Sequence, residues 1–125
     1  NSGSLNWKKN INSNLRPTLI DDYIFTVSMD GFLVIIENST GNIIRITDLF
    51  KNFKKKKRSK IYPIGFIVGI DNIYLTTNTG KLMIIDIKEG KTNSILKIDN
   101  DRISRPFVLN QNLYIIKENS IIRLN

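Results

Sequence analysis

A repeat with an offset of 49 residues constrains the fold of this chain more than any other feature of its sequence. Residues 21–41, DDYIFTVSMDGFLVIIENSTG, align without a gap with residues 70–90, IDNIYLTTNTGKLMIIDIKEG. A third copy, NQNLYIIKENSIIRLN, covers residues 110–125. Periods of about 20 to 50 residues are typical of folds in which one small unit stacks against copies of itself.

The copies agree at positions that have a structural purpose. Gly31 and Gly80 follow short polar residues between apolar runs, as in tight hairpins, where glycine accepts the positive φ that the turn requires. Gly41 and Gly90 close the corresponding segments of the first two copies. One aromatic position, one turn position and one aliphatic position recur in all three copies: Phe25, Tyr74 and Tyr114; Gly31, Gly80 and Ser120; Leu33, Leu82 and Ile122.

Short alternating or β-branched apolar runs, separated by Gly, Asn, Asp and Ser, predict an all-β fold. Their close spacing predicts antiparallel hairpins in series. Each repeat then forms a four-stranded meander with two apolar faces, which has to stack on its neighbours to bury both. The predicted strands are residues 5–9, 18–20, 23–28, 32–37, 43–47, 65–68, 73–77, 81–87, 94–98, 107–109, 113–117 and 121–124.

The repeats resemble the PQQ-type β-propeller repeat, in which a proline precedes the first strand and a Thr-Gly turn precedes a strand that carries Trp. Pro17 and Pro106 occupy the proline position, and Ser2-Gly3-Ser4-Leu5-Asn6-Trp7 fits the closing segment with its Trp. The segment from Thr40 to Arg45 fits the same pattern, with Arg45 in place of Trp. The resemblance implies a segment of about three four-stranded antiparallel blades from a larger ring.

We therefore predict an orphan outer strand in residues 1–16, a blade in 17–50, a basic loop in 51–60, a second blade in 61–100 and the last blade in 101–125. The orphan strand, around Trp7, is expected to pair with the third strand of the last blade, within one chain or between two, and so complete it. Three blades in a row leave two apolar faces uncovered, so we also expect the chain to self-associate.

The last copy stops after its third strand, and this ending resembles the C-terminal part of the periplasmic propeller lipoprotein that assists the outer-membrane barrel-assembly machinery. The resemblance implies a non-catalytic protein-binding scaffold that is periplasmic and associated with the outer membrane. Its expected partners are barrel-assembly components, with membrane contact only through a lipid anchor or a partner outside this segment.

Two other classes of protein share such repeats: PQQ-dependent dehydrogenases and ligand-sensing propeller domains. The sequence contains no Cys and no His, which excludes thiolate ligands and the most common general base. The aspartates stand at repeat corners, where turn hydrogen bonds explain them. We therefore expect neither an enzyme nor a bound cofactor or metal.

The chain has a net charge of +8, and its basic residues gather between Lys51 and Lys60, most densely in the run Lys54, Lys55, Lys56, Lys57 and Arg58. The run is either a docking loop for phosphate, anionic lipid or an acidic protein surface, or a mobile, solvated insertion. Nucleic acid is not the expected ligand, because the run lacks a platform of aromatic residues. The site residues are thus this run as a partner contact and, as structural repeat positions, Trp7, Gly31, Gly41, Gly80 and Gly90.

Overall fold

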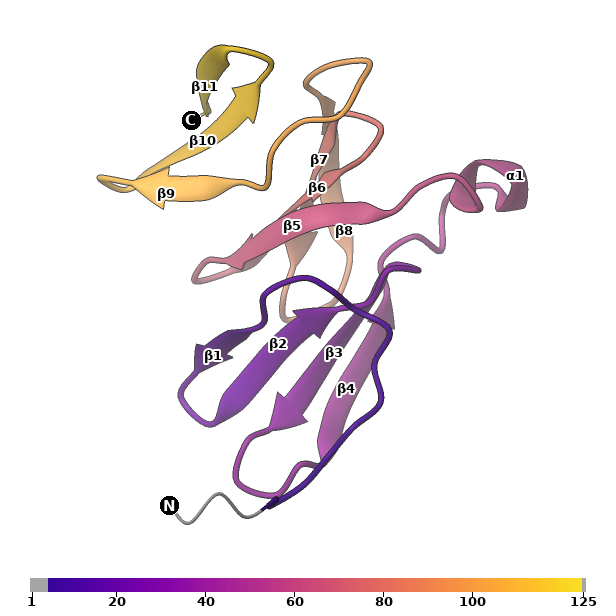
Figure 1. Cartoon of the computed structure of the whole chain (residues 1–125), viewed down its shortest axis with the longest axis vertical. Coiled ribbons are helices and arrows are strands. Elements are labelled where there is room, and N and C mark those ends of the chain that lie inside the picture. Colours follow the sequence, from indigo (N-terminus) through magenta and orange to yellow (C-terminus); the bar gives the residue numbers. More distant parts are fainter. Residues whose placement is uncertain (1–4, 125) are drawn as a thin grey trace.

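In a computed structural model, residues 5–124 are described, and they form three antiparallel sheets in succession along the chain (Figure 1). Each sheet is a meander, because its strands follow one another in chain order. The strands are β1 (Thr18–Ile20), β2 (Tyr23–Val27), β3 (Phe32–Glu37) and β4 (Ile43–Asp48); β5 (Pro63–Val68), β6 (Asn72–Thr77), β7 (Lys81–Asp86) and β8 (Thr92–Lys97); and β9 (Phe107–Leu109), β10 (Asn112–Lys117) and β11 (Ser120–Leu124).

The all-β prediction and the three sheets are confirmed, and we refer to β1–β4, β5–β8 and β9–β11 as the first, second and third blades. The first two blades have four strands each, whereas the described part of the third has three. The described residues therefore contain eleven strands where the sequence pattern predicted twelve.

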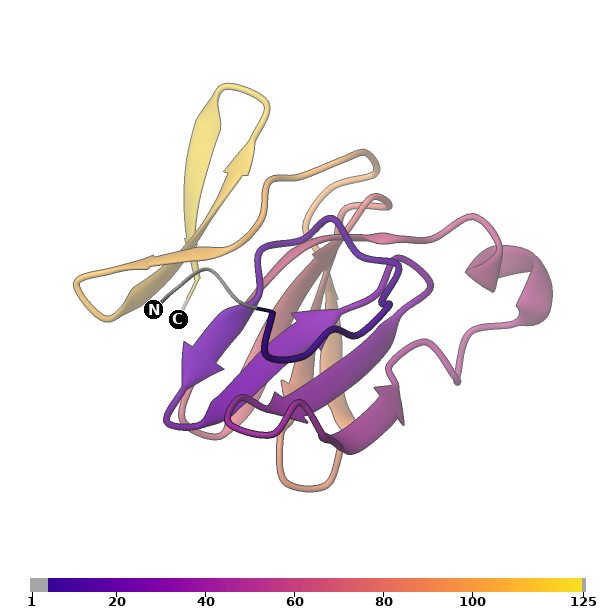
Figure 2. The same ribbon diagram turned by 60° about the horizontal axis from the view of Figure 1, so that its bottom comes forward.

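The missing strand is the one predicted around Trp7, and that prediction is wrong. Residues 5–17 form no strand in the described part of the chain, and β11 pairs there with β10 alone. The segment instead lies along the first blade (Figure 2), where the indole Nε1 of Trp7 donates to the carbonyl of Asn38 at 2.7 Å. Further along, the amide of Met29 donates to the carbonyl of Asn12 at 2.8 Å. These contacts hold the segment on the first blade, away from the pairing we expected; residues 1–4, which include Ser2, Gly3 and Ser4 of the predicted closing segment, lie outside the described residues.

The second blade is apolar on both faces, and both are covered by a neighbouring blade. On one face, Ile73 and Leu75 join residues of the first blade in the larger core. On the other face, Leu82 packs with Ile115 of the third blade in a smaller core. Strand residues alternate between the faces of a sheet, so successive apolar residues in β7 supply both cores. The expectation that the meanders stack in order to bury two faces is confirmed.

The repeated aromatic position faces the same way in each blade. Phe25 belongs to the core between the first and second blades, and Tyr74 packs against the core between the second and third. Tyr114 stacks on Phe107, with 5.5 Å between the ring centroids. Each aromatic residue pairs with a residue of the first strand of its blade, in the pairs Thr18–Phe25, Ile67–Tyr74 and Phe107–Tyr114.

The expected self-association stays a prediction. Apolar side chains of the third blade are partly exposed, including Val108 at 57% and Ile121 at 69%. A surface of this kind favours association, because covering it removes apolar area from water. Sedimentation of the full chain at micromolar concentration is the direct measurement; a sharp monomer boundary would contradict the expectation.

Candidate functional site

The basic run differs from the loop that we predicted, because Lys55–Arg58 form a short helix, α1. This helix lies between β4 and β5, at the border of the first two blades, and projects away from the sheets (Figure 1). Aromatic residues fix the chain just before it. Phe50 is fully buried in the larger core, and its ring meets that of Phe53 edge to face, with 5.6 Å between the centroids.

Arg58 fixes the other end of α1 to the first blade. Its guanidinium donates to both carboxylate oxygens of Asp48, at 2.7 and 2.8 Å. The same group lies over the ring of Phe32, 5.5 Å from its centroid. A bidentate pair that also stacks on an aromatic ring defines the orientation of the arginine far more closely than a single contact does. Arg58 therefore serves as an anchor, and its charge is already matched within the chain.

The second blade also contacts the basic run. The ammonium of Lys81 lies 5.6 Å from the centroid of the Phe53 ring. Lys81 occupies the position in the second repeat that Phe32 occupies in the first, 49 residues earlier. Arg58 contacts Phe32 of the first blade, and Phe53 contacts Lys81, the equivalent residue of the second blade. The segment from Phe50 to Arg58 is therefore held at the border of the two blades.

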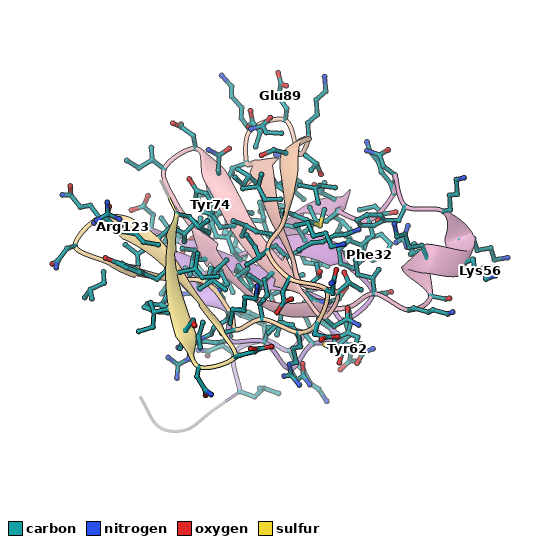
Figure 3. All side chains as sticks on the ribbon, turned by 90° about the horizontal axis from the view of Figure 1, so that it is seen from above. Phe32, Lys56, Tyr62, Tyr74, Glu89 and Arg123 are labelled. Carbon is teal, nitrogen blue, oxygen red and sulfur yellow. The ribbon has the colours of Figure 1, made fainter. Side chains whose placement is uncertain are left out.

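The other four residues of the basic run are lysines. Lys54, Lys55, Lys56 and Lys57 are exposed, and no ion pair involves them among the described residues. Figure 3 shows Lys56 directed outward from α1. We call these four residues the lysine surface. The five predicted contact residues lie together in the structure, but they differ in their contacts. Arg58 is bound to the first blade, whereas the four lysines are exposed.

Like charges crowd together at one edge of this surface. Partial burial of Lys81, together with repulsion and a hydrogen bond from Lys57, lowers the pKa of Lys81 below its usual value; repulsion from Lys97 adds to the effect. Positive charge therefore accumulates where the basic run meets the second blade.

Replacing Lys57 with glutamine should raise the pKa of Lys81 toward its usual value, because two of the causes that lower it disappear. Below its folded-state pKa, Lys81 is protonated, and its charge destabilises the folded state. As the pH rises through that pKa, Lys81 loses its proton in the folded state and this destabilisation disappears. The variant should therefore show a smaller gain in stability in the alkaline range. NMR titration of the Lys81 side chain measures the pKa, with Lys88→Gln as the control; an unchanged pKa in Lys57→Gln would contradict the arrangement.

Three of the predicted structural repeat positions, Trp7, Gly41 and Gly90, take part in a recurring contact between neighbouring segments. The ring of Trp7 packs on Gly41 so closely that a Cβ there would lie 2.6 Å from the ring. Arg45 makes the equivalent contact with Gly90, 49 residues later, and donates to the carbonyl of Ile87 at 2.6 Å. Asn38, the acceptor for Trp7, and Ile87 are also 49 residues apart. Arg45 therefore replaces Trp in the repeat and in its contact as well.

We expect Arg45→Ala to lower the free energy of unfolding by about 1–2 kcal/mol, because the carbonyls of Ile87 and Lys88 lose a charged donor. Arg45→Trp, which restores the residue of the resembled repeat, should retain most of the stability. Urea unfolding measures both, with Arg102→Ala as a control on an exposed arginine. Equal effects of Arg45→Ala and Arg102→Ala would show that the hydrogen bonds of Arg45 do not stabilise the folded chain.

Several aspartates at the repeat corners accept hydrogen bonds from residues of the turns. Asp22 accepts a hydrogen bond from the hydroxyl of Ser39 at 2.7 Å, and Asp86 accepts the amide of Lys88 at 2.8 Å. Asp99 accepts the amide of Asn100 at 2.7 Å. Within residues 5–124 there is no group of three or more His, Cys, Asp or Glu placed to hold a metal ion. No helix among these residues is long and apolar enough to cross a membrane.

Solved structures share this arrangement of stacked four-stranded sheets. BamB from Moraxella catarrhalis superposes with a TM-score of 0.68 and 17% sequence identity, over 90% of this chain and 31% of BamB. The chain folds as part of a β-propeller. Its blades also match the quinohemoprotein alcohol dehydrogenase ADHIIG from Pseudomonas putida HK5, with a TM-score of 0.61, 18% identity, and coverage of 87% of this chain and 17% of that one.

A third match is the β-propeller domain of Myceliophteria thermophila Cps50 (Swd1), with a TM-score of 0.63, 13% identity, and coverage of 75% of this chain and 31% of that one. No family model and no curated protein matches the sequence. The chain thus spans less than a third of each of these propellers, and the likeness establishes the fold.

Sequence reasoning missed the residues that anchor the lysine surface. Asp48 follows the strand predicted over residues 43–47, and nothing in the order of residues pairs it with Arg58, ten positions later. Lys81 was assigned only to a strand. The 49-residue alignment does place Lys81 at the position of Phe32. Both residues directly follow the turn glycine of their repeat.

Proposed function

We propose that this chain is part of a non-catalytic protein-binding scaffold and that its lysine surface contacts an acidic segment of the partner. The observation that carries the proposal is the anchored position of α1: Phe50 and Phe53 hold one end, and Arg58 holds the other. Lys54 to Lys57 are exposed between these anchors.

Anchoring favours binding for an entropic reason. A mobile run of lysines has to be ordered when a partner binds, and each long side chain ordered at an interface costs about 0.5–1.5 kcal/mol. Here the backbone is already fixed at both ends of α1, so only the lysine side chains remain to be ordered. Complementary charge then speeds the encounter with an acidic surface and excludes basic ones.

The proposed setting is outer-membrane β-barrel assembly in the periplasm. Two observations support it: the resemblance of the repeat ending to the barrel-assembly propeller lipoprotein, and the fold likeness to BamB over most of this chain. The partners proposed on this basis are proteins of the barrel-assembly machinery.

Binding of purified barrel-assembly proteins to the full chain tests this proposal. We expect the variant in which Lys54, Lys55, Lys56 and Lys57 are all changed to glutamine to bind about tenfold more weakly, because several charge pairs are lost. The matched control changes four exposed lysines elsewhere, Lys8, Lys9, Lys88 and Lys91, and removes the same charge. No binding by the unmodified chain would reject the setting, and equal losses in the two variants would reject the surface.

A dehydrogenase propeller is the competing proposal, because the blades also superpose on a quinohemoprotein alcohol dehydrogenase. A ligand-sensing propeller domain is the third class. Retention of pyrroloquinoline quinone and calcium by the purified protein, measured by absorbance and metal analysis, would favour the dehydrogenase over the scaffold.

A further inference from the structure

One position of the repeat lies near the start of the first strand in each of the three blades. Arg16, Gly65 and Arg105 each lie two residues before the strand residue that pairs with the repeated aromatic. They are therefore equivalent positions in the three blades, and two of the three are arginine. The repeat alignment does not show this, because it begins after these residues.

These three residues line a common cavity of about 180 Å³, together with Asn14. This volume is below the roughly 300–1,000 Å³ of pockets that take drug-sized ligands, but it suffices for one small ionic group. The residues that line the cavity include no Asp or Glu. Arg16 and Arg105 are thus the only charged residues among those that line the cavity.

Glycine at position 65 is what allows the arginines to share the cavity. A Cβ on Gly65 would lie 2.2 Å from the Cβ of Arg105, far closer than two carbon atoms can approach. A side chain here would displace Arg105 from its place. Gly65 of the second blade therefore leaves space at the position where the other two blades have Arg16 and Arg105.

Neither arginine is neutralised within the described part of the chain. No ion pair or side-chain hydrogen bond of Arg16 or Arg105 occurs there, and both residues are exposed. Other arginines of the chain behave differently: Arg58 is paired with a carboxylate, and Arg45 donates to carbonyl groups. Two arginines that line one small cavity bring two positive charges to it, and both charges would attract a bound anion.

We propose that this cavity binds a small oxyanion, a phosphate or a carboxylate group, held by Arg16 and Arg105. The planar guanidinium matches the geometry of both groups and can donate two parallel hydrogen bonds to either. The anion could be a free ion or the acidic side chain of a bound protein. The site is separate from the lysine surface, so its failure would leave the proposed scaffold function untouched.

Titration of the isotope-labelled full chain with inorganic phosphate, and separately with acetate, tests the site by NMR at constant ionic strength. We expect saturable shifts of the Gly65 amide and of the arginine Nε–H signals. Saturation by phosphate would indicate a phosphate site, and saturation by acetate alone a site for carboxylates. Shifts that rise linearly with either ion, with no saturation, would overturn the proposal.

Variants separate this site from general attraction to a basic chain. Arg16→Gln and Arg105→Gln should each weaken binding about tenfold, the loss expected when one charged hydrogen-bond donor is removed. Arg102→Gln, an exposed arginine that does not line the cavity, should bind as the unmodified chain does. Because Arg105 packs against Gly65, Arg16→Gln is the decisive variant if Arg105→Gln folds poorly. Equal weakening by Arg102→Gln and Arg16→Gln would overturn the proposal.

Discussion

Replacing Phe50 with alanine is expected to lower the free energy of unfolding of the full chain by about 3–5 kcal/mol, the range for a buried aromatic truncated to alanine. Phe50 is fully buried among apolar residues of the first two blades. Its ring lies against Gly31, where a Cβ would be 2.1 Å from the ring. Because Phe50 packs in the core shared by both blades, its truncation leaves a cavity between them, and most of the loss should be observed.

Urea unfolding followed by circular dichroism measures this loss. Phe53→Ala is the matched control, because Phe53 is the neighbouring ring of the pair but is only partly buried. Its edge-to-face contact is worth about 0.5–1.5 kcal/mol beyond the area it covers, so its effect should be clearly smaller. Equal effects of the two variants would contradict the placement of Phe50 in the core between the blades.

Gly80→Ala should cost about 3 kcal/mol or more, from two sources. Gly80 has φ of +76°, a region that costs an L-residue roughly 1–2 kcal/mol. A Cβ would also lie 2.3 Å from the carbonyl oxygen of Asp99 and 2.4 Å from that of Asp101. Since both contacts are with backbone atoms, no side-chain rotation can relieve them.

Gly69→Ala provides the comparison for Gly80→Ala. Its Cβ would meet the carbonyl oxygen of Asn72 at 3.3 Å, a tight contact at a position without positive φ. We therefore expect a loss well under that of Gly80→Ala, measured by the same unfolding experiment. If Gly69→Ala proved as costly, the conformation of the turn at Gly80 would not be the cause.

The strands were predictable because their signals are local. Gly31 and Gly80 stand at turns with φ of +92° and +76°, and the apolar runs on either side have the lengths of paired strands. The repeat then indicated that the blades stack, since each one is apolar on both faces. Periodicity alone was sufficient for this, as β7 shows with residues in both cores.

The errors arose where a long-range contact decides the outcome. The segment around Trp7 has the pattern of a strand, but Trp7 packs on Gly41 and binds the carbonyl of Asn38, and these contacts place it on the first blade. The lysine run lacks the pattern of a helix, and its like charges oppose one. The bond from Arg58 to Asp48 compensates, and it depends on where β4 ends in space.

Asp48→Asn tests most directly the proposal that the lysine surface binds an acidic partner because it is anchored. The variant breaks the ion pair with Arg58 and raises the net charge of +8 by one unit. Fluorescence anisotropy with a labelled peptide rich in Asp and Glu measures the affinity of the full chain at fixed salt. We predict that Asp48→Asn binds several-fold more weakly than the unmodified chain, because the fixed position of α1 is lost. Equal or tighter binding by Asp48→Asn would show that only the total charge matters and would contradict the account.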